Sequence, residues 1–187
     1  MKARNLKYTA MTACLAAGFL SLPIGAAAAV NAYLLIDGVS GESASRKGSI
    51  DVLSFSWGVS NPGVAATAGA TGAVKAVSHC QVSDLSIMKV LDATSPKLVE
   101  SAATGKAITS ITLTFSKAGA QPGAASDYFV MKLTDVHITS VQLSGSNENP
   151  TESVSFHAGQ VQGTYKGLGT PAASPPAWNI APAKGCQ

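Results

Sequence analysis

The 187-residue chain is poor in charge, since Asp, Glu, Lys and Arg together make up only 12% of it. Acidic residues are absent before Asp37, and Lys2, Arg4 and Lys7 are the only charged residues in that first stretch. These three account for the formal net charge of +3, because the rest of the chain carries ten basic and ten acidic residues. The net charge therefore does not indicate a basic surface, and we expect no nucleic-acid partner.

Catalytic and metal-binding motifs are also missing. There is no G-x-S-x-G elbow, C-x-x-C pair, Walker loop or H-E-x-x-H sequence. The histidines His79, His137 and His157 are 58 and 20 residues apart, without the local spacing of a metal site. The Gly167–Gly169 segment matches at most a fragment of a dinucleotide loop, and we reject that interpretation because Pro171 opposes the helix start that such a loop needs. We therefore expect no catalytic residues, no cofactor and no metal ion.

The alternative that the protein is an enzyme rests on its carboxylates, because a glycosidase needs only two of them on facing strands. Nothing in the sequence pairs the four candidates, and solvated turns and strand edges are the simpler interpretation. The candidates are Asp84, Asp92, Asp127 and Asp135.

The first 29 residues have the order of a secretory signal: basic residues, the apolar stretch Tyr8–Leu22, and the small residues Ala26–Ala29. We expect cleavage after Ala29, which predicts a periplasmic or extracellular protein with no membrane segment after cleavage. An uncleaved anchor is the alternative, since the uncharged stretch is long enough to span a bilayer. Cys14 weakly suggests a lipoprotein box, but it lies inside the apolar stretch rather than at its end.

Cysteine is scarce, and beyond the signal only Cys80 and Cys186 occur. In an exported protein two cysteines most economically form one disulfide. A Cys80–Cys186 bond would close a loop of more than one hundred residues and stabilise the fold by roughly 4 kcal/mol in the chain-entropy model. The alternative is a buried free Cys80 and an unpaired Cys186.

The length after the signal predicts a single domain, residues 30–170, followed by a tail, residues 171–187. Four of the nine prolines fall in this tail, which predicts an extended segment packing on the domain through Trp178 and Ile180. Residues 61–72 consist of Asn, Pro, Gly, Ala, Val and Thr without periodicity and predict a long loop.

Alternation of apolar and polar residues with period two predicts strands over most of the domain. In residues 79–91 both faces of the strand are partly apolar, which favours a strand covered on two sides or one that changes facing. Residues 33–36 and 110–116 predict two further strands. Residues 51–60 predict one strand whose buried face carries Leu53, Phe55, Trp57 and Val59.

One helix is predicted, over residues 95–105. Ser95 can serve as its N-cap, Pro96 occupies the first helical position, and Gly105 can adopt the left-handed conformation at the end. Two to three turns are too few for a stable isolated helix, so we expect it to pack on a sheet.

In residues 128–143 the apolar residues stand first at odd-numbered positions, then at even-numbered ones from near Asp135, and at odd-numbered ones again from near Ser140. We call each such shift a parity change. A straight strand cannot bury all of these apolar residues on one side, so we predict bulges or a bend at both places. A similar slip occurs around Gly159. Long, bent, Ser/Thr-rich antiparallel strands are typical of a barrel or a tightly curved sandwich. The expected fold is mainly β: a two-sheet antiparallel β-barrel or sandwich with one short flanking α-helix.

Several segments, in order along the chain, resemble the haemolysin-coregulated protein family, Hcp, of the bacterial type VI secretion system. Each is a weak motif alone, but together they cover nearly all of the chain after the signal. They are Ile50–Gly58, Asp84–Lys89, Asp92–Leu98, Lys132–Val136, Thr151–Phe156, Gln160–Val161, Tyr165 and Trp178–Ile180.

The resemblance implies a two-sheet β-barrel with one helix at its side and a structural, non-enzymatic role. It implies hexameric rings that stack into a secreted tube, with further copies, other tube components and small effectors in the lumen as partners. It also implies that the loop after the Trp-Gly strand contacts neighbouring subunits or rings. An exported binding or carrier module with the same fold but no tube assembly is the alternative. The contact residues would be Asn61, Pro62, Gly63, Val64, Gly69 and Gly72.

Overall fold

The computed structural model describes five stretches of the chain, and the expected signal segment, Cys186 and loop residues 62–72 lie outside them. The described stretches are residues 30–61, 80–117, 127–145, 149–167 and 176–181. The elements are β1 (Val30–Ile36), β2 (Ile50–Val52), β3 (Ser54–Ser56), β4 (Val59–Ser60), β5 (Gln81–Val82), β6 (Leu85–Val90), α1 (Ser95–Thr104), β7 (Ile108–Lys117), β8 (Asp127–Ser144), β9 (Thr151–Tyr165) and β10 (Ala177–Ile180).

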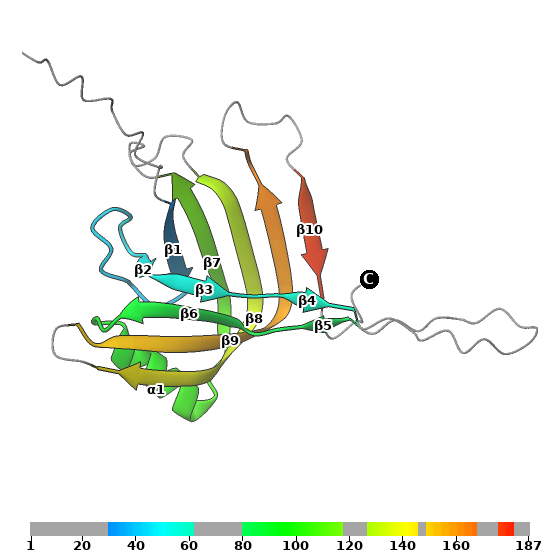
Figure 1. Ribbon diagram of the computed structural model, residues 1–187. Coiled ribbons are helices and arrows are strands. Elements are labelled where there is room, and N and C mark those ends of the chain that lie inside the picture. The colour runs from blue at the N-terminus through cyan, green and yellow to red at the C-terminus, as the bar shows by residue number, and fades with distance from the viewer. Residues whose placement is uncertain (1–29, 62–79, 118–126, 146–148, 168–175, 182–187) are drawn as a thin grey trace, which may run out of the picture.

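Eight strands form one antiparallel sheet that curls into a barrel of two layers (Figure 1). In one layer β1, β7, the first half of β8, the second half of β9 and β10 are neighbours. In the other, the second half of β8, the first half of β9, β6 and β3 are neighbours. β8 and β9 therefore run through both layers. β4 and β5 form a separate two-stranded hairpin. The mainly β, barrel-like fold class expected from the sequence is confirmed.

The barrel closes at Leu53, where the chain stops pairing with β1 and begins to pair with β6. β2 pairs with β1, the Leu53 amide donates a hydrogen bond of 2.8 Å to a β6 carbonyl, and β3 then pairs with β6. The prediction of one strand with a buried Leu53 face is therefore wrong. Leu53 and Phe55 are 60% and 47% exposed, whereas Ile50 and Val52 are buried. The change of partner breaks the regular alternation that the prediction assumed.

β6 is covered on one side only and keeps the same facing along its length, so both predicted alternatives, cover on two sides and a change of facing, are wrong. Leu85 and Ile87 point into the barrel and are buried. Met88 and Val90 point outward and are each 42% exposed. The third inward position of the strand holds Lys89, whose charge is compensated inside the barrel, as described below.

The bends of β8 and β9 lie where the parity changes predicted them. The register between β8 and β9 shifts between Ile138 and Ser140. Asp135 has a φ of 54°, and it is the one non-glycine residue with positive φ among those described. Its carboxylate lies over Gly159, where an added β-carbon would come within 2.8 Å of Asp135 Oδ2. These irregularities let each strand turn from one layer into the other, and the predicted bends are confirmed.

The helix is also confirmed, with one difference at its start. α1 ends at Gly105, which has a left-handed φ of 66°. The N-cap position is Thr94 rather than Ser95, and no side chain caps the helix. Ser95 is buried, and its hydroxyl accepts a hydrogen bond from Lys89 of the barrel instead of capping the helix. Leu98 is fully buried in the core and holds the helix against the barrel.

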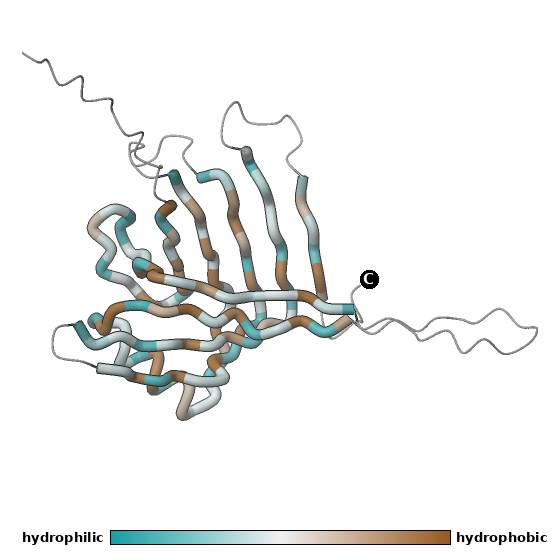
Figure 2. The backbone as a smooth tube through the Cα atoms, viewed as in Figure 1, coloured by the Kyte–Doolittle hydropathy of each residue, from teal (hydrophilic) through white to brown (hydrophobic). Residues whose placement is uncertain are grey.

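One continuous apolar core fills the barrel, with members from both layers and from α1. Figure 2 shows the corresponding alternation of apolar and polar residues along the strands. None of the helices in the described part of the chain is long and apolar enough to cross a membrane.

Candidate assembly surface

The loop expected to contact other subunits leaves and re-enters the barrel through the β4–β5 hairpin. The hairpin pairs Val59 with Val82, and the Ser83 amide donates a hydrogen bond of 2.9 Å to the Gly58 carbonyl. Asn61 is exposed at the outgoing end of this stem. The other proposed contact residues, Pro62, Gly63, Val64, Gly69 and Gly72, lie outside the described residues. The structure therefore defines the base of the loop, the β4–β5 stem, which continues beyond the ends of β3 and β6 (Figure 1).

Cys80 lies at the returning end of the same stem and is disulfide-bonded. Its bonding partner lies outside the described residues. The covalent bond therefore ties the base of the loop to another part of the chain.

A stacked tryptophan pair fixes the stem to β10. The rings of Trp57 and Trp178 are 5.1 Å apart and nearly parallel, at 9°. Trp178 lies over Gly163 of β9, where an added β-carbon would overlap the indole. Trp57 Nε1 is buried without a hydrogen-bond partner, so this side chain is held by stacking rather than by polar contacts. The stack thereby holds Trp178, a residue of the predicted tail, against Trp57, which immediately precedes the β4–β5 stem.

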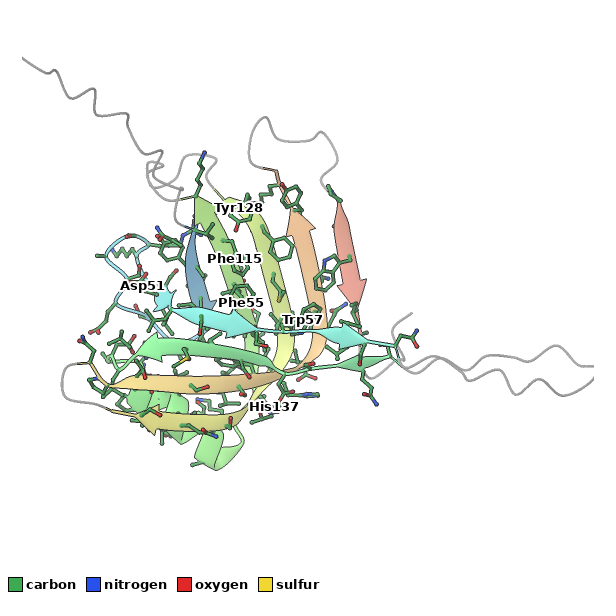
Figure 3. The ribbon with its side chains drawn as sticks, viewed as in Figure 1. Asp51, Phe55, Trp57, Phe115, Tyr128 and His137 are labelled. Atoms are coloured by element: carbon green, nitrogen blue, oxygen red, sulfur yellow. The ribbon has the colours of Figure 1, made fainter. Side chains whose placement is uncertain are left out.

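Further aromatic rings line the inner side of the β7–β8–β9 layer. Phe115 contacts Phe55, Tyr128 and Phe129 at ring distances of 4.7, 6.4 and 5.7 Å. Figure 3 shows Phe55, Trp57, Phe115 and Tyr128 along the space between β3 and this layer. Phe55 is half exposed, so this aromatic row reaches the surface at β3.

The outer face of the β3–β6–β9 layer carries serines instead of charges. Register places Ser56, Ser86 and Ser155 in one row across three strands, and Ser54, Met88 and Ser153 in the next. The hydroxyls of Ser86 and Ser155 are 2.8 Å apart and hydrogen-bonded. We call these five serines and Met88 the serine face. Hydroxyl groups cost less to desolvate against another protein surface than ions do, provided that they find hydrogen-bond partners there.

Beneath the serine face lies a buried ionic network that the sequence analysis missed. Lys89 and Glu152 have fully buried side chains, and Lys89 Nζ lies 2.7 Å from Glu152 Oε1. Lys89 also donates to Asp92 Oδ1 at 2.8 Å and to Ser95 Oγ at 3.1 Å. Glu152 Oε2 has no hydrogen-bond partner. The network joins β6, β9 and the start of α1.

The pKa of Asp92 reflects this network. Partial burial raises the pKa, but hydrogen bonds from Lys89 and Thr94 and the Lys89 charge outweigh it, so the net shift is downward. A sequence signal for the pair did exist. Lys89 has the parity of the buried Leu85 and Ile87, and Glu152 has the parity of Val154 and Phe156 on β9.

The four candidate carboxylates do not pair with one another. Asp127 binds Arg46 in an ion pair and accepts a hydrogen bond of 2.5 Å from Ser116. Asp92 binds Lys89, Asp135 lies over Gly159, and Asp84 accepts hydrogen bonds from Thr139 and His157. Each carboxylate has its own local partner, and a facing pair of the glycosidase kind does not form among them.

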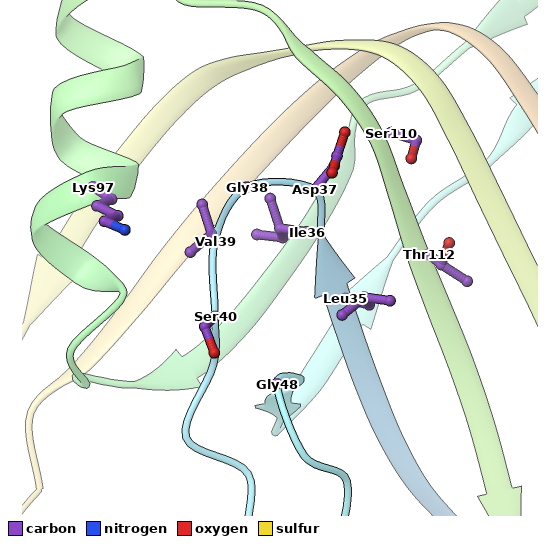
Figure 4. A pocket seen from close by; sticks show the side chains of 10 residues that line it. All are labelled: Leu35, Ile36, Asp37, Gly38, Val39, Ser40, Gly48, Lys97, Ser110 and Thr112. Atoms are coloured by element: carbon purple, nitrogen blue, oxygen red, sulfur yellow. The ribbon is translucent and has the colours of Figure 1, made fainter.

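A shallow groove of about 480 Å³ opens on the flank of the barrel, between the turn after β1 and the start of α1 (Figure 4). Lys97 of α1 and the hydroxyls of Ser40, Ser110 and Thr112 are among the groups that line it. Its lining is mixed in polarity, and Asp37 adds an acidic group to the same wall.

The fold and these surfaces define a small antiparallel β-barrel with an uncharged serine face on one layer and a separate two-stranded hairpin, β4–β5. The chain belongs to the Hcp family: the family model described as "Type VI secretion system effector, Hcp" matches residues 33–165. The curated protein hcp1 of Pseudomonas aeruginosa is 34% identical over 87 residues, which is 46% of this chain and 52% of that protein. The match thus spans about half the length of this curated relative.

Solved structures agree with the family assignment. Hcp1 from Salmonella typhimurium is 26% identical, with a TM-score of 0.65 over 84% of this chain and 98% of that one. A type VI secretion system effector from Yersinia pestis is also 26% identical, with a TM-score of 0.62 over 80% of this chain and 98% of its own.

Proposed function

We propose that this protein is a structural subunit of a type VI secretion tube, forming hexameric rings that stack and can carry small effectors in the lumen. The single observation that carries the proposal is the family match across residues 33–165, which covers the barrel from β1 to β9. The Salmonella and Yersinia structures support it, because each aligns with this chain over 98% of its own length.

The surface chemistry supports self-association. The serine face is uncharged, and only 12% of the whole chain is charged, so contacts between copies require little desolvation of ions. β10 pairs with β9 on one side only within the described residues, which leaves an edge strand that a neighbouring subunit would cover.

The direct test is the assembly state of residues 30–187. We expect a species of six subunits by light scattering after gel filtration, and ring-shaped particles in negative-stain micrographs. A protein that stays monomeric at high concentration, with intact β structure by circular dichroism, would contradict the proposal.

Val64→Asp is expected to weaken assembly by shifting most of the protein from rings to smaller species. The proposed loop contact would place the new carboxylate against another subunit, where an unpaired charge costs several kcal/mol. The same substitution at Val99, which is 41% exposed on α1, is the matched control and should leave assembly unchanged. Equal ring yields for both variants in gel filtration would remove the loop from the interface.

A second candidate function is an exported carrier module without tube assembly. The observation that favours it is the disulfide at Cys80, since disulfides persist in oxidising compartments. The predicted signal segment points the same way, and the flank groove beside Lys97 would be the ligand site. Fractionating cells that express the full-length gene separates the two: processed monomer in the periplasm or medium supports the carrier, and processed rings there support export of the tube subunit.

We propose Cys186 as the disulfide partner of Cys80. Cys80→Ser and Cys186→Ser should each lower the free energy of unfolding by roughly 4 kcal/mol, because the bond restricts a very long loop in the unfolded chain. Mass spectrometry after alkylation without reductant should find no modified cysteine in the processed protein. Two alkylated cysteines, or unequal stability losses in the two variants, would rule out this pairing.

A further inference from the structure

The β4–β5 stem is weakly held by its own contacts. It forms a sheet of its own with two cross-strand pairs, Val59 with Val82 and Ser60 with Gln81. Val59 is 43% exposed, Ser60 and Gln81 are exposed as well, and none of the four paired residues belongs to the apolar core. An isolated two-stranded hairpin is only marginally stable in water. The stem therefore depends on restraints from other parts of the chain.

Two such restraints act at opposite ends of the stem. At its root, beside the barrel, Trp57 stacks on Trp178 of β10. At its other end Cys80 adjoins Gln81, a member of the pair nearest the loop, and Cys80 is disulfide-bonded. The covalent bond thus lies at the point where the paired stem ends and the loop begins.

We propose that the disulfide at Cys80 is a redox switch for assembly, so that rings form from the oxidised protein and not from the reduced one. The inference rests on the proposed function, because it concerns the loop through which subunits would contact one another. With the bond intact, the two chain ends that carry the loop are held in one geometry. After reduction only two strand pairs maintain that geometry, so a contact between subunits must first order the stem and is weakened by the entropy lost.

The chemical step is thiol–disulfide exchange, with a dithiol as the reductant and a small-molecule disulfide as the oxidant. One thiolate of the dithiol attacks the bond and releases one cysteine. Its second thiol then attacks the mixed disulfide and releases the other cysteine, so the protein gains two electrons and two protons and the dithiol leaves as a cyclic disulfide. Cys80 is partly exposed, which gives the reductant access. Because disulfides persist in oxidising compartments and are rare in the cytosol, the switch would delay assembly until the chain is exported.

The test compares the processed protein, residues 30–187, before and after treatment with dithiothreitol at pH 8, by gel filtration with light scattering. We expect reduction to lower the fraction of protein in rings at least fivefold, and reoxidation with oxidised glutathione to restore it. Cys80→Ser should match the reduced protein and not respond to dithiothreitol. Far-ultraviolet circular dichroism should show intact β structure in the reduced protein. Loss of that structure would overturn the switch, because the bond would then hold the fold rather than the stem.

Trypsin cleavage after Lys75, the one Lys or Arg in residues 61–79, shows whether the effect passes through the loop. Reduction should speed this cleavage at least fivefold, whereas cleavage after Lys47, which is exposed in the connection between β1 and β2, should keep its rate. Equal cleavage rates after Lys75 would overturn the role of the stem. Equal ring fractions in the oxidised and reduced protein would overturn the switch and leave the tube function standing. Rings in neither state would contradict the tube function itself.

Discussion

Lys89→Met is expected to lower the free energy of unfolding by about 3–5 kcal/mol, as removal of one partner from a buried ion pair does. The side chains of Lys89 and Glu152 are completely buried, and Glu152 Oε2 has no hydrogen-bond partner even with Lys89 present. Without the ammonium, the Glu152 carboxylate would face an apolar core with no compensating charge. Urea denaturation followed by far-ultraviolet circular dichroism measures the loss.

Two further variants separate the buried charge from the shape of the side chain. Lys89→Met combined with Glu152→Met should recover most of the lost stability, because an apolar pair of similar volume avoids the desolvation cost. Lys132→Met replaces an exposed lysine on β8 and should change stability by less than about 0.5 kcal/mol. A Lys89 variant that loses no more than the Lys132 control would show that the pair does not hold the barrel together.

The bends of the barrel were predictable because each is visible in the sequence of a single strand. The parity changes at Asp135, Ser140 and Gly159 mark where β8 and β9 pass from one layer into the other, and they can be seen without knowing which strands pair. The helix was predictable for the same reason, since Pro96 and Gly105 act on their own backbone. Such signals require no knowledge of the rest of the fold.

The exposure of Leu53 and Phe55 was not predictable from their alternation. Their environment depends on a change of partner from β1 to β6, which is a tertiary event. The Lys89–Glu152 pair was hidden in a similar way. The alternation along β6 and β9 places both side chains inside the barrel, whereas the cost of burying a charge predicts that they lie outside. Both can be buried because Lys89 and Glu152 are cross-strand partners, which the sequence does not show. Of the proposed contact loop, the structure describes only Asn61, so its role rests on the experiments above.

The attachment of β10 can be tested by changing Gly163 of β9, which lies against the ring of Trp178. Gly163→Val should lower the free energy of unfolding by at least about 2 kcal/mol, because its β-carbon would overlap the Trp178 ring and force β10 outward. Trp57 and Trp178 are the only tryptophans of the chain and are both in the stack, so the emission should shift to longer wavelength. Gly58→Val is the control, since a β-carbon there meets only Ser83 Oγ, at 3.7 Å.

Trp178→Ala should itself cost about 3 kcal/mol or less, because the ring is only partly buried. Gly163→Val should then be nearly neutral in the Trp178→Ala background, since the group that it overlaps has gone. A coupling energy of at least 1 kcal/mol in this double-mutant cycle assigns the cost to the contact between β9 and the indole. Additive effects would instead mean that Gly163 is needed for the backbone of β9, and that the stack does not hold β10 in place.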